Sequence, residues 1–161
     1  PEELDRLRTE SDRAIAIDVF VAPEAVDAVY HAGKTSYLLP DGPAGVKPYA
    51  LLHRGMGEQR RHAGARVVLS GRERLVLVRP MGRLLAMSTL VYESQVKVAE
   101  AFEEAVTPPE LSTEELQLAT SLVAASCAEQ FDLGRYRDLY TECLGALIEA
   151  KIDPSQYEVQ F

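Results

Sequence analysis

Three short apolar runs that follow one another between residues 65 and 92 constrain the fold more than any other feature of the sequence. They read ARVVLS, RLVLVRP and RLLAMSTLVY, and the turn sequences SGRE (70–73) and PMGR (80–83) separate them. Runs of this length between glycine-containing turns are typical of strands joined by hairpins. The middle run is apolar at every position over 75–78, as expected of a strand with neighbours on both sides and cover on both faces. The sequence therefore predicts a β-meander at this place.

The patterns around this meander predict a mixed α+β domain. In AIAIDVFV at 14–21, the larger apolar residues Ile15, Ile17 and Val19 alternate with Ala16 and Asp18. HAGKTSYLLP at 31–40 ends at a proline. Both segments predict strands. PEAVDAVY between them begins with a proline suited to a first helical turn, and PDGPAG after them predicts a loop. A helix is predicted over about 47–63, with one apolar face and with Gly64 as the cap beyond its end.

The last third of the sequence predicts a C-terminal helical arm. Ser112-Thr-Glu-Glu115 is a capping box, in which the serine and glutamate side chains satisfy backbone donors at a helix start. FDLGRYRDLYTECLGALIEAKI carries apolar residues at a three-four spacing that predicts a second amphipathic helix. Two such helices joined by about five residues predict an antiparallel helical hairpin. The predicted domains are thus a β-rich portion, 1–106, and the arm, 107–161.

Length and composition are those of a globular protein that does not cross a membrane. The chain has 161 residues, of which 47% are apolar and 26% charged, and no stretch approaches about eighteen consecutive apolar residues. Cys127 and Cys143 have no short spacing and no nearby histidine, so they are interpreted as buried free thiols in a reducing compartment. A cytoplasmic protein without a signal peptide, a metal or a cofactor is expected.

Charge is distributed unevenly along the chain. The formal net charge is −8, yet residues 53–83 carry eight arginines, no lysine and two acidic residues, whereas 1–52 and 84–161 have net charges of −4 and −10. The planar arginine fork binds phosphate through two hydrogen bonds, and a positive face binds duplex DNA without reading its bases. A phosphate-binding surface is the hypothesis. The alternative is that these arginines are scattered, solvated residues that balance an acidic protein.

Five arginines are candidates for this surface. Arg72 and Arg74 are two residues apart, so both can project to the same side of a strand end, and Arg66 lies on the preceding strand. Arg60 and Arg61 lie at the end of the predicted helix and add to the positive electrostatic potential of this surface. The hypothesis requires that Arg66, Arg72 and Arg74 share one concave surface and are not neutralised by acidic neighbours.

No catalytic motif is visible. The sequence contains no HExxH, GxSxG, GxxxxGK[ST] or GxGxxG pattern, and its adjacent glutamates would not face each other on a helix. Its three histidines are interpreted as polar residues at or near the surface rather than as ligands. A hydrolase that uses one cysteine with a histidine is a minor alternative, and the sequence favours a protein that is not an enzyme.

Four motifs in the same order resemble bacterial Ku proteins. They are TSYLLPDG, KPYALLHRGM, GARVVLSGRERLVLVRPMGRLLAMSTLVYESQV and FDLGRYRDLYTECLGALIEAKI, and the resemblance covers about residues 2–152. It implies a partial, mostly antiparallel, Ku-like β-barrel with a C-terminal helical arm. It also implies a homodimer whose ring is threaded by double-stranded DNA ends, which recruits an ATP-dependent DNA ligase in non-homologous end joining. Such a protein would be nucleoid-associated.

By position, the resemblance implies DNA contacts by Arg72 and Arg74 at a basic hairpin tip, by Arg66 on the strand before it and by Lys97 after the last barrel strand. The first strands of Ku-like proteins and the segment that closes their ring have no counterpart here, so the sequence resembles the second half of a Ku core. Its exposed sheet edges are expected to pair with another chain. A second hypothesis is a Ku-derived dimerisation or protein-interaction module with little DNA affinity.

Overall fold

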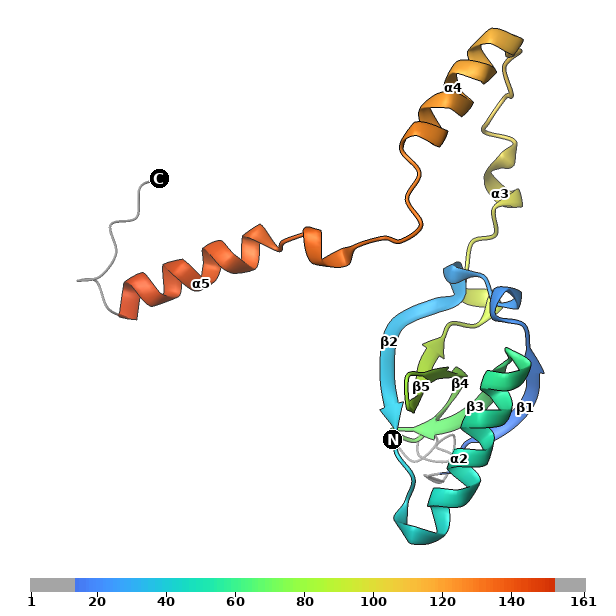
Figure 1. Ribbon diagram of the computed structural model, residues 1–161, viewed down its shortest axis with the longest axis vertical. Coiled ribbons are helices and arrows are strands. Elements are labelled where there is room, and N and C mark those ends of the chain that lie inside the picture. The colour runs from blue at the N-terminus through green and yellow to red at the C-terminus, as the bar shows by residue number, and fades with distance from the viewer. Residues whose placement is uncertain (1–13, 153–161) are drawn as a thin grey trace, which may run out of the picture. The chain divides into compact units, whose positions relative to one another are not determined.

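The computed structural model describes residues 14–152, and the chain divides into two units between Thr107 and Pro108. The first unit holds a β-sheet and one long helix, and the second unit holds the two helices of the arm (Figure 1).

One antiparallel sheet in the order β1-β3-β4-β5-β2 forms the first unit. Its strands are β1 (Ala16–Val21), β2 (His31–Leu38), β3 (His62–Leu69), β4 (Arg72–Met81) and β5 (Leu84–Leu90). The predicted meander is confirmed as β3-β4-β5, with β1 and β2 added at its two outer sides. Among the described residues β1 and β2 are the edges of the sheet, which is therefore open. The α+β fold class is confirmed.

Tight turns set the register of the meander. Ser70 and Gly71 have positive φ angles of 52° and 73°, and Leu69 pairs with Arg72 directly beside them. Positive φ at both central residues is what a type I′ turn requires, and the twist of that turn matches the twist of the strands it joins. Gly82, with a φ of 57°, lies in the turn between β4 and β5. The first turn therefore makes Arg72 the first residue of β4.

The helix α2 (Gly42–Gln59) begins and ends earlier than the helix predicted over 47–63. The PDGPAG segment is a loop only at its start, because Pro43 lies in the first helical turn, where its missing N–H and fixed φ are tolerated. The helix ends at Arg60, which adopts the left-handed conformation and donates its N–H to carbonyls of the last turn. Gly64, the predicted cap, lies within β3 instead.

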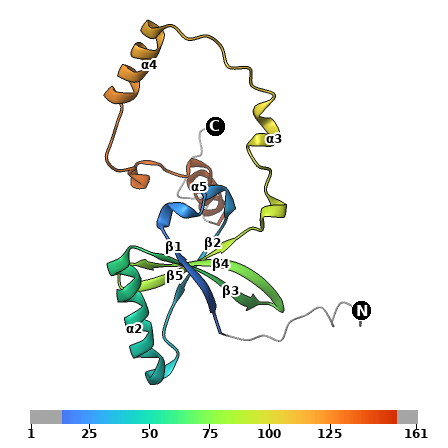
Figure 2. The same ribbon diagram turned by 90° about the vertical axis from the view of Figure 1, so that its right-hand side faces the viewer.

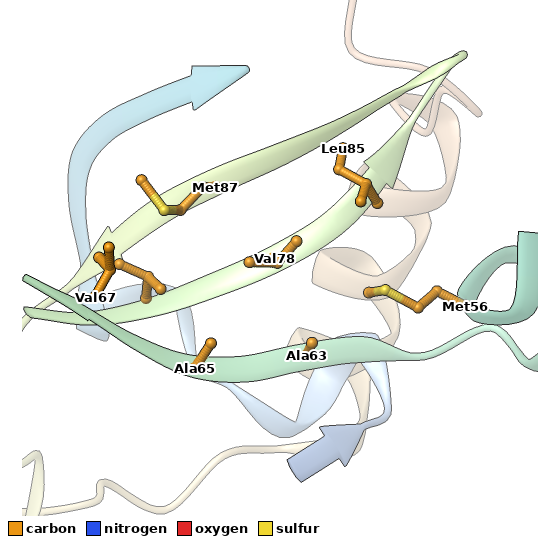
Figure 3. Packing of buried hydrophobic residues seen from close by; sticks show 8 residues of the cluster. Met56, Ala63, Ala65, Val67, Val78, Leu85 and Met87 are labelled. Carbon is orange, nitrogen blue, oxygen red and sulfur yellow. The ribbon is translucent and has the colours of Figure 1, made fainter. Parts of the chain in front are cut away.

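The core lies between α2 and one face of the sheet, and α2 runs along that face (Figure 2). Met56 points from α2 toward the sheet (Figure 3). The buried cluster consists of Met56, Ala63, Ala65, Val67, Val76, Val78, Leu85 and Met87. Tyr49 and Leu52 of α2 pack against it, so the apolar face predicted for this helix faces the sheet. On the other face of the sheet Leu77 is also buried, so β4 is covered on both sides, as its unbroken apolar run predicted.

The Tyr49 hydroxyl joins α2 to two strands. It donates a hydrogen bond to the Leu38 carbonyl oxygen at 2.7 Å and accepts one from the Leu85 N–H at 2.8 Å. Leu38 of β2 pairs with Leu85 of β5, so one side chain satisfies a donor and an acceptor where the two strands meet. His53 makes a second link from α2, because its Nε2 lies 2.9 Å from the carbonyl oxygen of Gly82 in the β4–β5 turn.

PEAVDAVY does not form the predicted helix. It forms two 3-10 turns, η1 (Pro23–Ala25) and η2 (Ala28–Tyr30). The reason is Asp27, whose side chain accepts the N–H of Val29 at 2.9 Å and so competes with a continuous helix. After β5, the connection to the arm contains the 3-10 turn η3 (Glu93–Gln95) and the short helix α3 (Glu100–Glu103).

The arm contains the helices α4 (Thr113–Ala125) and α5 (Leu139–Ile152). The capping box at the start of α4 is confirmed, because the Glu115 N–H donates to the Ser112 hydroxyl at 3.2 Å and the Ser112 N–H donates to the Glu115 carboxylate at 2.9 Å. The hydrogen bonds from Ser112 hold the pKa of the Glu115 carboxyl below its usual value.

The short connection predicted between the two helices of the arm is wrong, because residues 126–138 connect them. Asp132 accepts the N–H of Gly134 and holds a 3-10 turn, η4 (Leu133–Arg135). Asp138 then accepts the N–H and the hydroxyl of Thr141, so its side chain caps the start of α5.

Neither helix of the arm buries a residue. The predicted helical hairpin would pack the apolar faces of α4 and α5 against each other. Instead these faces are exposed, with Leu122 at 63% and Leu144 at 42% exposure. For the same reason Cys127 and Cys143, predicted to be buried, are exposed free thiols.

Candidate nucleic-acid interface

Arg72 and Arg74 leave the sheet on the same face at the β3–β4 tip (residues 69–74). Arg74 pairs with Val67 and Arg72 pairs with Leu69, and residues directly opposite each other in an antiparallel pair share a face. Val67 is buried in the core, so the two arginines continue the core-bearing face beyond the end of the core. Both arginines are exposed, and within residues 14–152 neither has a hydrogen-bond or ion-pair partner.

Arg66 lies on the opposite face of the sheet from Arg72 and Arg74. It pairs with Leu75, and side chains alternate between faces along a strand. Glu73 shares the face of Arg66. The expectation that the three arginines share one surface is therefore wrong. The pairing between strands decides which of their residues share a face, and spacing within one strand does not reveal that pairing.

Two carboxylates hold the Arg66 guanidinium. Its Nε donates to Asp18 Oδ2 at 2.8 Å and its Nη2 donates to Asp18 Oδ1 at 3.0 Å, which is a bidentate pair. Its Nη1 lies 3.6 Å from Glu73 Oε2. The hydrogen bond between Arg66 and Asp18 is the largest cause that lowers the pKa of Asp18 and raises the pKa of Arg66. Contrary to expectation, Arg66 is neutralised by acidic neighbours.

Arg60 and Arg61 lie at the end of β3 that is remote from the β3–β4 tip. They directly precede β3, whereas Arg72 pairs with its last residue, Leu69. At about 3.3 Å per strand residue, β3 separates the two places by roughly 25 Å. The arginines of residues 53–83 therefore do not form one patch, since the chain distributes them over both ends and both faces of the sheet. The hypothesis of one surface shared by Arg66, Arg72 and Arg74 is wrong as stated, and of these three only Arg72 and Arg74 remain candidates for phosphate contacts.

Lys97 lies in the connection between η3 and α3. Its Nζ is 5.9 Å from the centroid of the Phe102 ring, within the range of a cation–π contact. The side chain is exposed. Among residues 14–152 it has no hydrogen-bond or ion-pair partner.

Sequence reasoning missed Asp18 and Tyr92. The pairing of β1 with β3 shifts between Ile17 and Val19, so Asp18 occupies a β-bulge at the edge of the sheet. Tyr92 follows β5, and its hydroxyl donates to the Glu73 carbonyl oxygen at 3.2 Å. A single charged residue within an apolar strand was a signal for Asp18, whereas nothing in the sequence connects Tyr92 with Glu73.

The chemistry that this arrangement offers is anion binding. Arg72 and Arg74 present unpartnered guanidinium groups on one face of a tight turn, and such groups bind phosphate oxygens. Over residues 14–152, no three His, Cys, Asp or Glu side chains are placed to hold a metal ion. In the same range, no helix combines the length and the hydropathy of a membrane span.

The chain is similar to one known protein family and to several named proteins. A model of the Ku70/Ku80 beta-barrel domain matches residues 1–118. The chain is similar to the non-homologous end joining protein Ku of Cereibacter sphaeroides, with 36% identity over 95% of this chain and 57% of that protein. It is similar to the proteins of the same name from Heliobacterium modesticaldum (36% identity, 94% of this chain, 54% of that protein) and Bradyrhizobium sp. (32%, 94%, 51%). The chain spans about half the length of these relatives.

Proposed function

This chain belongs to the Ku70/Ku80 β-barrel domain family, and from that membership we propose that it binds ends of double-stranded DNA, independently of sequence and without catalysis, in double-strand break repair by non-homologous end joining. The names of its relatives support the pathway, since they are non-homologous end joining proteins. A DNA-end binder of this kind acts at the nucleoid.

The observation that carries the proposal is the pair of free guanidinium groups at the β3–β4 tip. The formal net charge of −8 repels DNA, so binding depends on a local positive site. Arg72 and Arg74 provide one on a single face, where no carboxylate of the described residues pairs with them. Contacts of this kind go to phosphate oxygens, which every duplex presents, and they carry no sequence information.

In this proposal, Arg60 and Arg61 form a second basic site. Both are exposed and follow α2. Because β3 holds them roughly 25 Å from the β3–β4 tip, they reach phosphates elsewhere on the duplex rather than the same ones. Lys97 adds positive charge near α3.

A homodimer is the second part of the proposal. The sheet ends in two edge strands, and both helices of the arm carry exposed apolar side chains, such as Leu118 at 65% and Ile148 at 50% exposure. Unpaired strand edges and large apolar surfaces are stabilised by contact with another chain. An ATP-dependent DNA ligase is the remaining partner in this proposal, and it is proposed because the resemblance to bacterial Ku proteins implies it.

Fluorescence anisotropy with linear duplexes tests the DNA-binding proposal. Two duplexes of equal length and unrelated sequence are titrated with the full chain at several salt concentrations. Equal affinities and a log K that falls linearly with log salt concentration support phosphate contacts. A marked preference for one sequence contradicts the proposal. Absence of binding at physiological salt also contradicts the proposal, and it favours the second hypothesis, a protein-interaction module with little DNA affinity.

A further inference from the structure

We propose that Asp18, Arg66 and Glu73 form a positioning cluster that holds the β3–β4 tip in place, so that Arg66 supports DNA binding through this cluster and not by contact with phosphate. The inference rests on the proposed DNA-binding function, because it names what sets the geometry of that site.

The cluster connects three adjacent strands. Asp18 lies on β1, Arg66 on β3 and Glu73 on β4, and Arg66 is the middle member, with Asp18 oxygens at 2.8 and 3.0 Å and a Glu73 oxygen at 3.6 Å. A bidentate arginine–carboxylate pair fixes orientation as well as distance. The cluster therefore resists movement of the β3–β4 tip relative to the edge strand.

The β-bulge in β1 directs Asp18 to its partner. The register shift between Ile17 and Val19 gives β1 one extra residue against β3, and that residue is Asp18. Bulges change the direction in which a side chain points. A carboxylate at this place on an edge strand therefore reaches Arg66, a residue 48 positions away in the sequence.

Glu73 is the link between the cluster and the DNA-binding arginines, since it lies between Arg72 and Arg74. Its carboxylate faces Arg66, and its backbone carbonyl accepts a hydrogen bond from the Tyr92 hydroxyl at 3.2 Å. The residue between the two arginines is thus held at its side chain and at its backbone. Because neighbouring strand residues point to opposite faces, holding Glu73 on one face directs both arginines to the other.

Arg66 itself is poorly placed to bind phosphate. Its Nε, Nη1 and Nη2 atoms all face carboxylate oxygens, so a phosphate would have to displace Asp18 or Glu73. It also lies on the sheet face opposite to Arg72 and Arg74, so one phosphate group cannot meet all three.

The variant Asp18→Asn distinguishes a positioning role of Arg66 from direct contact between Arg66 and phosphate. It removes a negative charge near the DNA site, so electrostatics alone predicts tighter binding and, if Arg66 then contacts a phosphate, a salt dependence steeper by about 0.9. The positioning cluster predicts the opposite, weaker binding by about two- to fivefold, with a salt dependence no steeper than that of the unchanged protein. Tighter binding would overturn the proposal.

Two further variants complete the test. Asp41→Asn makes the same change of charge at a side chain without a capping hydrogen bond, and it should not weaken binding. Asp18→Asn combined with Arg66→Gln restores the original net charge, and it should bind as weakly as Asp18→Asn alone, because both changes disrupt one cluster. A further loss in the double variant, with a salt dependence shallower by about 0.9, would identify Arg66 as a phosphate contact and overturn the proposal.

Hydrogen exchange of the free protein provides a readout that needs no DNA. Amides of residues 66–76 should exchange faster in Asp18→Asn than in the unchanged chain or in Asp41→Asn. Unchanged exchange contradicts the positioning cluster even if DNA binding is present. Faster exchange in a protein that does not bind DNA supports the cluster and contradicts the proposed function instead.

Discussion

Val67 pairs directly with Arg74 across β3 and β4, so the Arg74 side chain leaves the sheet on the same face as the buried Val67 side chain. The core-bearing face and the proposed DNA-binding face are thus one continuous surface, apolar where α2 covers it and basic where it extends beyond the core. Stability of the hairpin and placement of the arginines therefore depend on the same strand pairing.

Replacement of Arg72 and Arg74 together by Ala should weaken binding to every duplex sequence alike. Each lost phosphate contact removes a released counterion, so the slope of log K against log salt concentration should become shallower by roughly one to two units. Anisotropy titrations at several salt concentrations measure both effects.

The matched control for that variant removes Arg54 and Arg137. Each of these arginines is paired with a glutamate of its own segment, at 2.8 Å for Glu58 and 2.9 Å for Glu142, and the formal change of charge is the same. Binding by this control should stay close to that of the unchanged protein. Equal losses in both variants would show that net charge, and not the β3–β4 tip, governs binding.

Ser70→Asn should stabilise the hairpin. Ser70 has a φ of 52°, and a left-handed conformation costs an ordinary residue about 1–2 kcal/mol, whereas asparagine tolerates it and Asn-Gly is the preferred type I′ pair. The free energy of unfolding should rise by up to about 1 kcal/mol, measured by urea denaturation. Ser70→Val should lower it, and a stabilising effect of valine would contradict the assigned turn.

Tyr49→Phe should lower the free energy of unfolding by about 1–3 kcal/mol. The hydroxyl satisfies the Leu38 carbonyl and the Leu85 N–H, and phenylalanine keeps the ring but leaves both backbone groups without that partner. Tyr37→Phe is the control, because the Tyr37 side chain is 61% exposed. Equal stability of the two variants would show that the Tyr49 hydroxyl contributes nothing.

The stabilisation by Asp18 should depend on pH. The hydrogen bond from Arg66 lowers the pKa of Asp18 in the folded protein, so the stabilisation is complete above the ordinary aspartate value of about 3.9 and is lost as the pH falls through the lower folded value. The difference in Tm between the unchanged protein and Asp18→Asn should therefore be present at neutral pH and shrink below about pH 4. In an Arg66→Ala background the difference should vanish at every pH.

Much of this architecture follows from local patterns in the sequence. The meander was predictable because glycine at positions 71 and 82 marks two tight turns between apolar runs. The shared face of Arg72 and Arg74 was predictable from their spacing alone, because strand side chains alternate.

What the sequence could not provide depends on contacts between distant segments. Arg66 was expected to face DNA, and the structure pairs it with Asp18 because strand order and a bulge bring β1 beside β3. The start of α2 was missed because Pro43, which reads as a loop residue, also suits a first helical turn. The connection before α5 was missed because Asp132 and Asp138 bind nearby backbone groups within an apolar helical pattern.

A mobility-shift comparison of linear with closed-circular duplex of equal length tests the central claim most directly. A chain that binds DNA ends should retard the linear duplex and leave the closed circle unshifted, and Arg72→Ala with Arg74→Ala should weaken that retardation. Equal retardation of both forms, or of neither, would contradict DNA-end binding by this protein.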